Sequence, residues 1–203
     1  MIIDISHWNP VVDWDGLKVS FLIFKATQGT SYVDNQFYKT AAECEKRHIP
    51  YWIYHYFNRG NEKAQAEFFV TQTKEYIGDY FRGYILDVED NNTVDGVKAA
   101  IEVIKATGNK YMLYTMYSQY GVYKDVIESL GANGRHWEAR YGSNNGQYNP
   151  IYGVHKSVDL HQYTSRGFCY GVGTNVDISR LTGKTSLEWF VGSAEKKESR
   201  LTC

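Results

Sequence analysis

Cysteine is scarce in this chain of 203 residues, and the few cysteines lie far apart. There are three of them, Cys44, Cys169 and Cys203. An odd number without a short repeated spacing argues against a disulfide framework and against the paired cysteines of a zinc site. We therefore expect free thiols and no bound metal.

The chain also lacks a long apolar run and an excess of charge of one sign. It opens with Met1-Ile2-Ile3-Asp4-Ile5-Ser6, without the basic start and apolar stretch of a signal peptide, and no later run is long enough for a transmembrane helix. The net charge of -1 gives no support to binding of nucleic acid or a membrane surface. We expect synthesis in the cytoplasm, no nucleic-acid partner and no membrane insertion.

What the chain does contain is typical of one soluble domain. Hydrophobic residues make up 43% and charged residues 22%, and 203 residues suffice for one substantial core. Aromatic residues reach 16%, with 18 tyrosines and 5 tryptophans. Such rings stack on the apolar faces of sugars but are equally ordinary core material, so they are a weak hint of carbohydrate binding.

Short β-rich apolar runs alternate with stretches of helical character through the first two thirds of the chain. Eight strands are expected, at 2–6, 21–27, 51–57, 84–89, 111–115, 136–141, 158–163 and 176–179. Four helices are expected near 34–49, 61–76, 99–106 and 119–130, with Phe37, Ala41 and Cys44 on one face of the first and Ala64, Phe68 and Gln72 on one face of the second.

Alternating strands and helices imply parallel strands joined by right-handed crossovers. After about residue 131 the connections are rich in Gly and Asn, and no convincing helix fits. The pattern predicts a single-domain α/β fold, an irregular TIM-like (β/α)5β3 barrel. We expect this domain to span residues 1–190, and residues 191–203, which are charged and lack an apolar face, to be a disordered tail or the start of a linker.

The run Gly83-Tyr84-Ile85-Leu86-Asp87-Val88-Glu89 brings two carboxylates to the end of one strand. Side chains alternate along a strand, so Asp87 and Glu89 point the same way with Cβ atoms about 6 to 7 Å apart. At that distance each charge disturbs the pKa of the other, and the pair can hold a proton near neutral pH. Acid-assisted cleavage of a glycosidic bond needs such a pair. A solvated strand end, or a cation site with Asp90, is the plainer alternative.

Polar side chains recur at the carboxyl ends of the other expected strands, which share one mouth in a parallel barrel. They are Asp4, Ser6, Lys25, Thr27, His55, Tyr114, Glu138, Arg140, Tyr141, His161, Gln162, Tyr163 and Asp177. Their convergence favours a functional site, because polar groups in apolar strands are costly unless they are paired or used. Individually, Lys25 can simply neutralise Asp4 or Asp177, His55 can be a satisfied core histidine, and Arg140 can be a structural ion-pair partner.

The motifs together resemble the family 25 glycoside hydrolases, the Chalaropsis-type lysozymes common in bacteriophage lysins. The resemblance covers about residues 1–185 in the correct order. It rests on Asp4-Ile5-Ser6, Trp14, Phe24-Lys25-Ala26-Thr27-Gln28-Gly29-Thr30, Tyr54-His55-Tyr56, the stretch 64–68, Leu86-Asp87-Val88-Glu89, Trp137-Glu138-Ala139-Arg140-Tyr141, Gln162-Tyr163-Thr164-Ser165 with Gly167, and Val176-Asp177. Two departures are His161, where a Trp usually precedes Gln-Tyr, and Ser179, where Asn is common.

The resemblance implies an N-acetylmuramidase that cleaves the β-1,4 bond between N-acetylmuramic acid and N-acetylglucosamine in peptidoglycan. Glu89 would be the general acid, and Asp87 would stabilise the transition state directly or orient the substrate's acetamido group. Asp4 and Asp177, the other two catalytic carboxylates, would lie on neighbouring strands across barrel closure, where they can hydrogen-bond sugar groups or tune Glu89. The expected substrate-binding residues are Lys25, His55, Tyr56, Tyr114, Trp137, Arg140, Tyr141, Gln162 and Tyr163.

Further expectations concern the biological setting. No cofactor or metal is required, although a cation site formed by Asp4, Asp87 and Asp177 is an open alternative. The resemblance implies a phage or prophage endolysin that is made in the host cytoplasm and reaches the wall after holin-dependent release or lysis. Its partner would be the peptidoglycan glycan strand, and a separate or missing C-terminal wall-binding domain is possible.

Three other functions compete with this one. A non-catalytic wall-binding barrel would not need both Asp87 and Glu89. A chitinase-like hydrolase typically has a longer run of alternating acids than Asp87-Val88-Glu89. A sugar-phosphate barrel enzyme has only the weak hint of Gly171-Val172-Gly173, with no clear helix after it.

Overall fold

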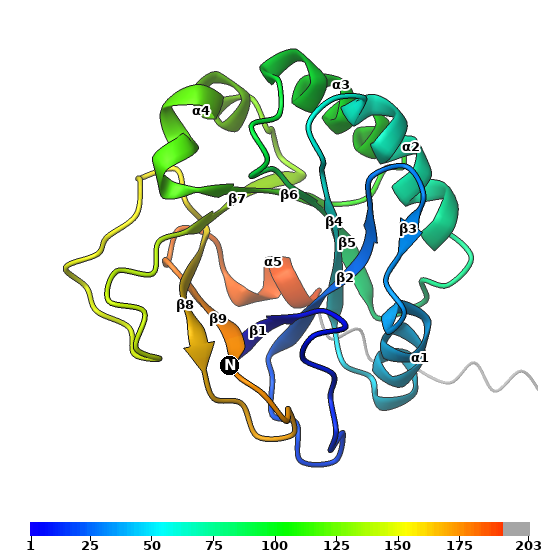
Figure 1. The fold of residues 1–203 in the computed structure, drawn as a ribbon, viewed down its shortest axis with the longest axis vertical. Helices are drawn as coiled ribbons and strands as arrows, with labels where there is room; N and C mark the ends of the chain where they lie inside the picture. Colours follow the sequence, from blue (N-terminus) through cyan, green and yellow to red (C-terminus); the bar gives the residue numbers. More distant parts are fainter. Residues whose placement is uncertain (193–203) are drawn as a thin grey trace, which may run out of the picture.

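The structure, a computed structural model, describes residues 1–192 of the chain. Eight strands close into a barrel, and helices cover one half of its outside (Figure 1). The strands are β1 (Ile2–Ile5), β2 (Phe21–Gln28), β3 (Tyr32–Val33), β4 (Tyr51–Tyr56), β5 (Phe81–Asp87), β6 (Tyr111–Met116), β7 (Gly134–Ala139), β8 (Leu160–Gly167) and β9 (Val176–Leu181). The helices are α1 (Phe37–Arg47), α2 (Glu62–Thr73), α3 (Val94–Lys105), α4 (Tyr120–Glu128) and α5 (Leu187–Val191), with a 3₁₀ turn, η1, at Tyr117–Gln119.

Neighbouring strands around the barrel run in the order β1, β2, β4, β5, β6, β7, β8 and β9, and β9 pairs with β1 to close the ring. All neighbours are parallel except β9, which is antiparallel to both β8 and β1. The short β3 forms a hairpin on β2 outside the ring. The predicted irregular α/β barrel is confirmed, and all eight predicted strands are present.

The connections differ in detail from the sequence pattern. Among the described residues, the link from β1 to β2 contains no helix, so four crossovers carry one. Helix α3 begins five residues before its predicted start because Thr93 caps it, accepting a hydrogen bond from the Gly96 N–H at 3.0 Å. The predicted strand at 84–89 ends earlier, at Asp87, and the short β3 and α5 were not predicted.

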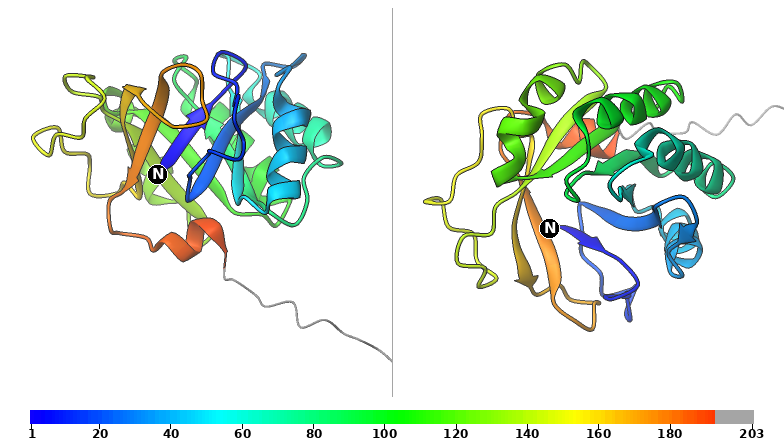
Figure 2. Two further views of the ribbon diagram at one scale, coloured as in Figure 1. Left: turned by 90° about the horizontal axis from the view of Figure 1, so that it is seen from below. Right: turned by 45° about the horizontal axis from the view of Figure 1, so that its top comes forward.

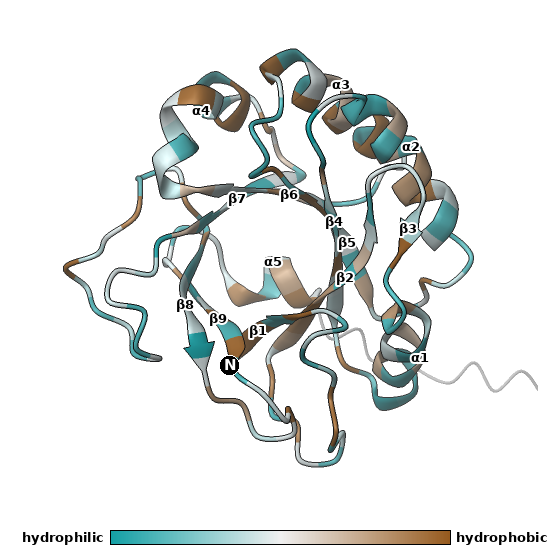
Figure 3. Cartoon of the chain, in the orientation of Figure 1, coloured by the Kyte–Doolittle hydropathy of each residue, from teal (hydrophilic) through white to brown (hydrophobic). Residues whose placement is uncertain are grey.

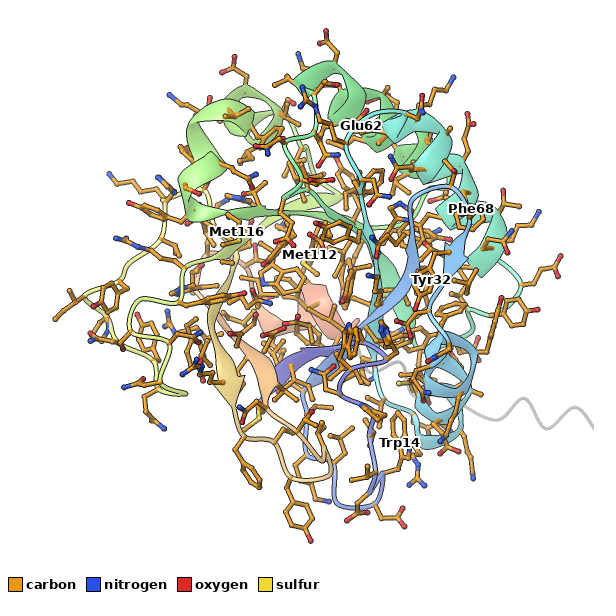
Figure 4. The ribbon with its side chains drawn as sticks, viewed as in Figure 1. Trp14, Tyr32, Glu62, Phe68, Met112 and Met116 are labelled. Atoms are coloured by element: carbon orange, nitrogen blue, oxygen red, sulfur yellow. The ribbon has the colours of Figure 1, made fainter. Side chains whose placement is uncertain are left out.

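Helix packing confirms one predicted face and corrects another. Phe37, Ala41 and Cys44 of α1 are buried against the barrel as expected. In α2 the predicted face was wrong, because Ala64 is exposed and Phe68, labelled in Figure 4, is only partly covered. Gln65 and Phe69 are buried instead. Gln65 is buried because its amide holds the loop after β4, donating to the Asn58 and Gly60 carbonyls and accepting from the Asn58 N–H.

Two apolar layers follow from the alternation of side chains along the strands. One layer lies between the strands and helices α1 to α4, in which hydrophobic residues alternate with hydrophilic ones (Figure 3). The other fills the barrel itself, and its fully enclosed members include Phe21, Ile23, Trp52, Ile85 and Met112. Strands buried on both faces are expected for a parallel barrel.

Helix α5 closes the end of the barrel opposite the mouth (Figures 1 and 2). Phe190 is fully buried and stacks on Phe21 with ring centroids 5.5 Å apart. Lys110 Nζ and Trp52 Nε1 donate to the carbonyl oxygens of Trp189 and Phe190 at 2.7 and 2.9 Å. The expected tail began at residue 191, but Val191 belongs to α5. The tail residues after Gly192 lie outside the described part of the chain.

We expect Phe190→Ala to destabilise the barrel by about 3 to 5 kcal/mol, because it removes a buried ring and leaves a cavity at the barrel floor. A loss of that size lowers the melting temperature by roughly 6 to 20 °C in a domain of this length. Thermal unfolding followed by circular dichroism measures it. Leu187→Ala on the same helix is the control, because that side chain is 40% exposed. Equal, small shifts in both variants would mean that α5 does not stabilise the barrel.

No helix among residues 1–192 is long and apolar enough to cross a membrane. Cys44 and Cys169 are buried free thiols, and Cys203 lies outside the described residues.

Candidate active site

The carboxyl ends of the barrel strands open into a pocket of about 170 Å³, here called the acidic pocket. Its lining combines four carboxyl groups with aromatic and amide side chains: Asp4, Tyr54, Tyr56, Asp87, Glu89, Tyr114, Trp137, Tyr141, Gln162 and Asp177. The four acids come from β1, from the end of β5 and the residue two beyond it, and from β9. Strands far apart in sequence thus bring four acids to one place.

The period of two along each strand explains which residues reach the pocket. Tyr54 and Tyr56 of β4 face the barrel interior, whereas His55 between them faces outward. The same alternation turns Trp137 and Tyr141 inward and Arg140 outward. Asp4 and Asp177 are opposite each other in the β1–β9 register, so they meet directly inside the barrel.

Gln162 organises the floor of the acidic pocket. Its Nε2 donates to both carboxylate oxygens of Asp4, at 2.9 and 3.0 Å. Its Oε1 accepts from the hydroxyls of Tyr114 and Tyr141, at 2.9 and 2.8 Å. One amide therefore fixes an acid and two aromatic rings, which keeps the pocket pre-organised.

Burial raises the pKa of both Asp4 and Asp177. The pKa of Asp4 rises well above its usual value, first because the group is buried and then because Asp177 is a like charge beside it. Burial raises the pKa of Asp177 to about 6, and a hydrogen bond with Asp4 works in the opposite direction. The pair therefore holds a proton at a pH where ordinary aspartates are ionised.

Asp87 and Glu89 form a second coupled pair. Burial raises the pKa of Asp87 well above its usual value, and Glu89 adds to this shift. The pKa of Glu89 is also raised, first by burial and then by the charge of Asp177. Oδ1 of Asp87 is buried and has no hydrogen-bond partner among residues 1–192. Because an unsatisfied buried oxygen is costly, this atom is suited to accept a hydrogen bond from a ligand.

Lys25 lies at the edge of the acidic pocket, where its charge lowers the pKa of Asp87 and Glu89. Its Nζ donates to Gln28 Oε1 at 2.6 Å and lies 5.2 Å from the ring centroid of Tyr56. Burial lowers the pKa of Lys25 itself, and the neighbouring carboxylates oppose that shift. Lys25 is thus the nearby cation that balances part of the acidic charge.

The structure brings together nine of the thirteen residues predicted for the site. Asp4, Asp87, Glu89, Asp177, Tyr56, Tyr114, Trp137, Tyr141 and Gln162 all line the acidic pocket. Trp137 is held there by Ser179, one of the two departures from the family pattern, whose Oγ accepts from Trp137 Nε1 at 3.0 Å.

Three predicted substrate-binding residues, His55, Arg140 and Tyr163, do not line the pocket. His55 and Tyr163 lie at outward positions of β4 and β8, and Arg140 follows the end of β7. His55 is fully buried between Thr27 and Gln65, and burial lowers its pKa to about 3. Arg140 lies over the Tyr117 ring, 3.8 Å from its centroid, and donates to the Gly153 carbonyl. Tyr163 packs beside Tyr148.

Sequence reasoning missed one pocket residue, Tyr54. Burial raises its pKa well above the usual value, and the charge of Asp87 contributes next. Strict alternation from Tyr56 would have identified Tyr54 and excluded His55. As for a cation site, the described residues contain no group of three or more His, Cys, Asp or Glu that is arranged to hold a metal ion.

The raised pKa of Asp177 predicts how stability depends on pH. A carboxyl whose pKa is higher in the folded chain stabilises the fold at acidic pH, and this contribution is lost as the pH rises through the folded value. For Asp177 the loss falls between pH 4 and about 6. We therefore expect Asp177→Asn to be more stable than the wild type at pH 8, by about 1 to 3 kcal/mol.

Urea unfolding at pH 4 and pH 8 measures this effect. The two proteins should be closer in stability at pH 4, where Asp177 is protonated in the folded chain and partly protonated in the unfolded chain. Asp95→Asn, at the exposed start of α3, is a control that leaves the acidic pocket unchanged. A less stable Asp177→Asn at pH 8 would show that hydrogen bonds of this carboxylate outweigh its burial.

Comparison with known proteins identifies relatives over almost the whole domain. The sequence model of "Glycosyl hydrolases family 25" matches residues 3–172, which include Asp4, Asp87 and Glu89 but not Asp177. Lysozyme M1 of Streptomyces globisporus is 26% identical over 207 residues, covering 91% of this chain and 68% of that protein.

Two solved structures share the architecture. The catalytic domain of endolysin ply40, from bacteriophage P40 of Listeria monocytogenes, superimposes with a TM-score of 0.81 at 27% identity, covering 95% of this chain and 97% of the other. The bacterial lysozyme from Streptomyces coelicolor gives 0.75 at 22% identity over 95% and 97% of the two chains, a likeness of fold.

Proposed function

Because the chain belongs to the glycosyl hydrolases of family 25 and is therefore a glycosidase, we propose that it is an N-acetylmuramidase. In this proposal it cleaves the β-1,4 bond between N-acetylmuramic acid and N-acetylglucosamine in bacterial peptidoglycan. The observation that carries the proposal is the acidic pocket, where four carboxyl groups with raised pKa values stand among aromatic rings at the mouth of the barrel.

Glu89 is the proposed general acid. Glu89 is less buried than Asp87, so its carboxyl can reach the glycosidic oxygen of a substrate that enters the pocket from solvent. Its raised pKa keeps it protonated at a pH where an ordinary glutamate is ionised. Glu89 donates this proton to the leaving oxygen as the bond to the anomeric carbon breaks. It then accepts a proton from the water that attacks the same carbon.

Asp87 is the proposed partner of the substrate's acetamido group. Its unpartnered Oδ1 can accept the acetamido N–H, which turns the acetamido oxygen toward the anomeric carbon as an internal nucleophile. Direct stabilisation of the positive charge on the sugar ring is the alternative role. Both carboxylate oxygens of Asp4 already accept from Gln162, whereas Oδ1 of Asp87 is unpartnered among the described residues. Asp87 is therefore the better candidate for the contact with the substrate.

Asp4 and Asp177 have a supporting role in this mechanism. The charge of Asp177 raises the pKa of Glu89, and Asp4 is tied to Gln162. Tyr114 and Tyr141, which Gln162 also holds, offer ring faces and hydroxyls to a sugar.

In its biological setting, we propose that the protein is a phage or prophage endolysin. The likeness to the endolysin of a Listeria phage supports this setting. The protein would act on the cell wall after release from the host cytoplasm, with the glycan strand as its partner and with or without a separate wall-binding domain.

Incubation of the protein with purified peptidoglycan tests the proposed activity. We expect new reducing sugars and no new free amino groups, because a glycosidase leaves the peptide bonds intact. Release of amino groups without reducing sugars would contradict the proposal. Chitin is the matched control substrate, since a chitinase-like enzyme would cleave it as well, and a wall-binding barrel would cleave neither.

A further inference from the structure

A second hollow lies beside the acidic pocket, at the same mouth of the barrel. This side pocket, of about 530 Å³, has His7, Trp8, Lys25, Gln28, Tyr32 and Asn58 in its lining. These residues come from the loop after β1, from β2 and its hairpin with β3, and from the loop after β4, so they sit at carboxyl ends of neighbouring strands. Figure 4 shows Tyr32 on this hairpin, beside the barrel opening.

The two pockets meet at Lys25. Its ammonium nitrogen lies 5.2 Å from the ring centroid of Tyr56, which lines the acidic pocket, and 5.8 Å from that of Tyr32, which lines the side pocket. A polar chain continues from Lys25 Nζ to Gln28 Oε1 and from Gln28 Nε2 to Asn58 Oδ1, at 2.6 and 3.2 Å. A ligand in one pocket can therefore extend into the other across a continuous polar edge.

Trp8 is the exposed aromatic residue of the side pocket. Its side chain is 78% exposed, yet the turn that carries it is fixed by the Ser6 N–H bond to Asn9 Oδ1 at 2.7 Å and the Asn9 N–H bond to the Ser6 carbonyl at 3.1 Å. The His7 ring lies 4.4 Å from the Trp8 ring, centroid to centroid. A large apolar surface held rigidly in water loses little conformational entropy when a ligand stacks on it.

The chemistry of the side pocket fits a neutral, hydroxyl-rich ligand. The lining of the side pocket contains no carboxylate, and Asp34, which is bound to His7 Nδ1 at 2.7 Å, is fully buried. The charge of Lys25 is shared with Asp87 and Glu89. The rest of the lining offers the exposed ring of Trp8, the amides of Gln28 and Asn58, and hydroxyl groups. This set suits a sugar ring better than the carboxylates of a peptide.

We infer that the side pocket is an additional saccharide subsite, in which Trp8 stacks on a further sugar of the glycan strand whose scissile bond lies in the acidic pocket. This inference rests on the proposed function for the identity of the strand. It makes affinity depend on chain length, since only a long strand fills both pockets.

Binding, measured without turnover, tests the subsite separately from the activity. Glu89→Gln protein is titrated calorimetrically with peptide-free glycan strands of four and of eight sugars, with and without Trp8→Ala. We expect the longer strand to bind more tightly, and Trp8→Ala to weaken its binding about two- to tenfold while leaving the shorter strand unaffected. Trp8→Phe should retain most of the affinity for the longer strand.

Phe168→Ala is the matched control, because Phe168 is 74% exposed and lines neither pocket. Equal losses in Trp8→Ala and Phe168→Ala, or no dependence on chain length, would overturn the subsite. A loss with Trp8→Ala that occurs only for strands bearing peptide stems would assign the side pocket to the peptide and also overturn it. Failure of the proposed function would show separately, as absence of cleavage by the wild-type protein.

Discussion

Glu89→Gln is expected to abolish nearly all hydrolysis of peptidoglycan while the barrel remains folded. A glutamine has no proton to give to the departing oxygen, and help from a general acid contributes about 10²- to 10⁴-fold in rate. The amide is nearly the same size as the carboxyl, so the packing around the partly buried side chain of residue 89 is preserved. Release of reducing sugars gives the rate, and thermal unfolding shows that the fold is intact.

Asp90→Asn is the matched control for this prediction. Asp90 is one residue from Glu89, but it does not line the acidic pocket, and its Oδ2 accepts the Arg59 N–H. We expect this variant to keep most of the activity. Turnover near the wild-type rate in Glu89→Gln, or an equal loss in Asp90→Asn, would contradict the assignment of Glu89 as the acid.

Asp87→Asn is expected to reduce the rate by about 10²- to 10³-fold, the loss found when one preorganised electrostatic contact to a transition state is removed. The change replaces an ionisable carboxyl group with a neutral amide at the position of the unpartnered Oδ1. Under the acetamido role, the defect should fall on kcat more than on KM. A rise in KM alone would show that Asp87 only binds the ground-state sugar.

The pH profile separates Asp87 from Asp177 as the source of the raised pKa of Glu89. The sequence pattern predicts that Asp87 supplies the like charge, whereas in the structure Asp177 is the largest contributor after burial. Removing a like charge lowers the pKa of Glu89, so Glu89 loses its proton, and with it the ability to act as an acid, at a lower pH. We therefore expect the alkaline limb of activity to move to lower pH in Asp177→Asn. A limb that moves only in Asp87→Asn would contradict this.

The barrel and the catalytic face of β5 could be predicted from sequence because both depend on short-range patterns. Alternation placed Asp87 and Glu89 on one face, and the order of strands and helices implied the parallel barrel. The helix face of α2 was wrong because Gln65 is buried through loop hydrogen bonds rather than hydrophobicity. Helix α5 was missed because five residues are too few for a periodic signal.

The site was less predictable at single residues. Their position at strand ends and in the family motifs selected His55, Arg140 and Tyr163, although alternation turns them away from the lumen, and the same reasoning omitted Tyr54. The pairing of Asp4 with Asp177 depends on closure of the barrel between the first and last strands, a contact spanning most of the chain. The expected closure of the barrel already placed Asp4 and Asp177 on neighbouring strands, and the structure confirms it. The order of the contributions to the pKa of Glu89 required the structure.

In the proposed function, the acidic pocket cleaves the bond on the reducing side of N-acetylmuramic acid. The most direct test is to digest purified peptidoglycan, reduce the new chain ends with borohydride and identify the reduced sugar after acid hydrolysis. Muramicitol should accumulate with the wild-type protein and be absent with Glu89→Gln. Accumulation of glucosaminitol instead would contradict the account, because it would mean that the protein cleaves on the reducing side of N-acetylglucosamine.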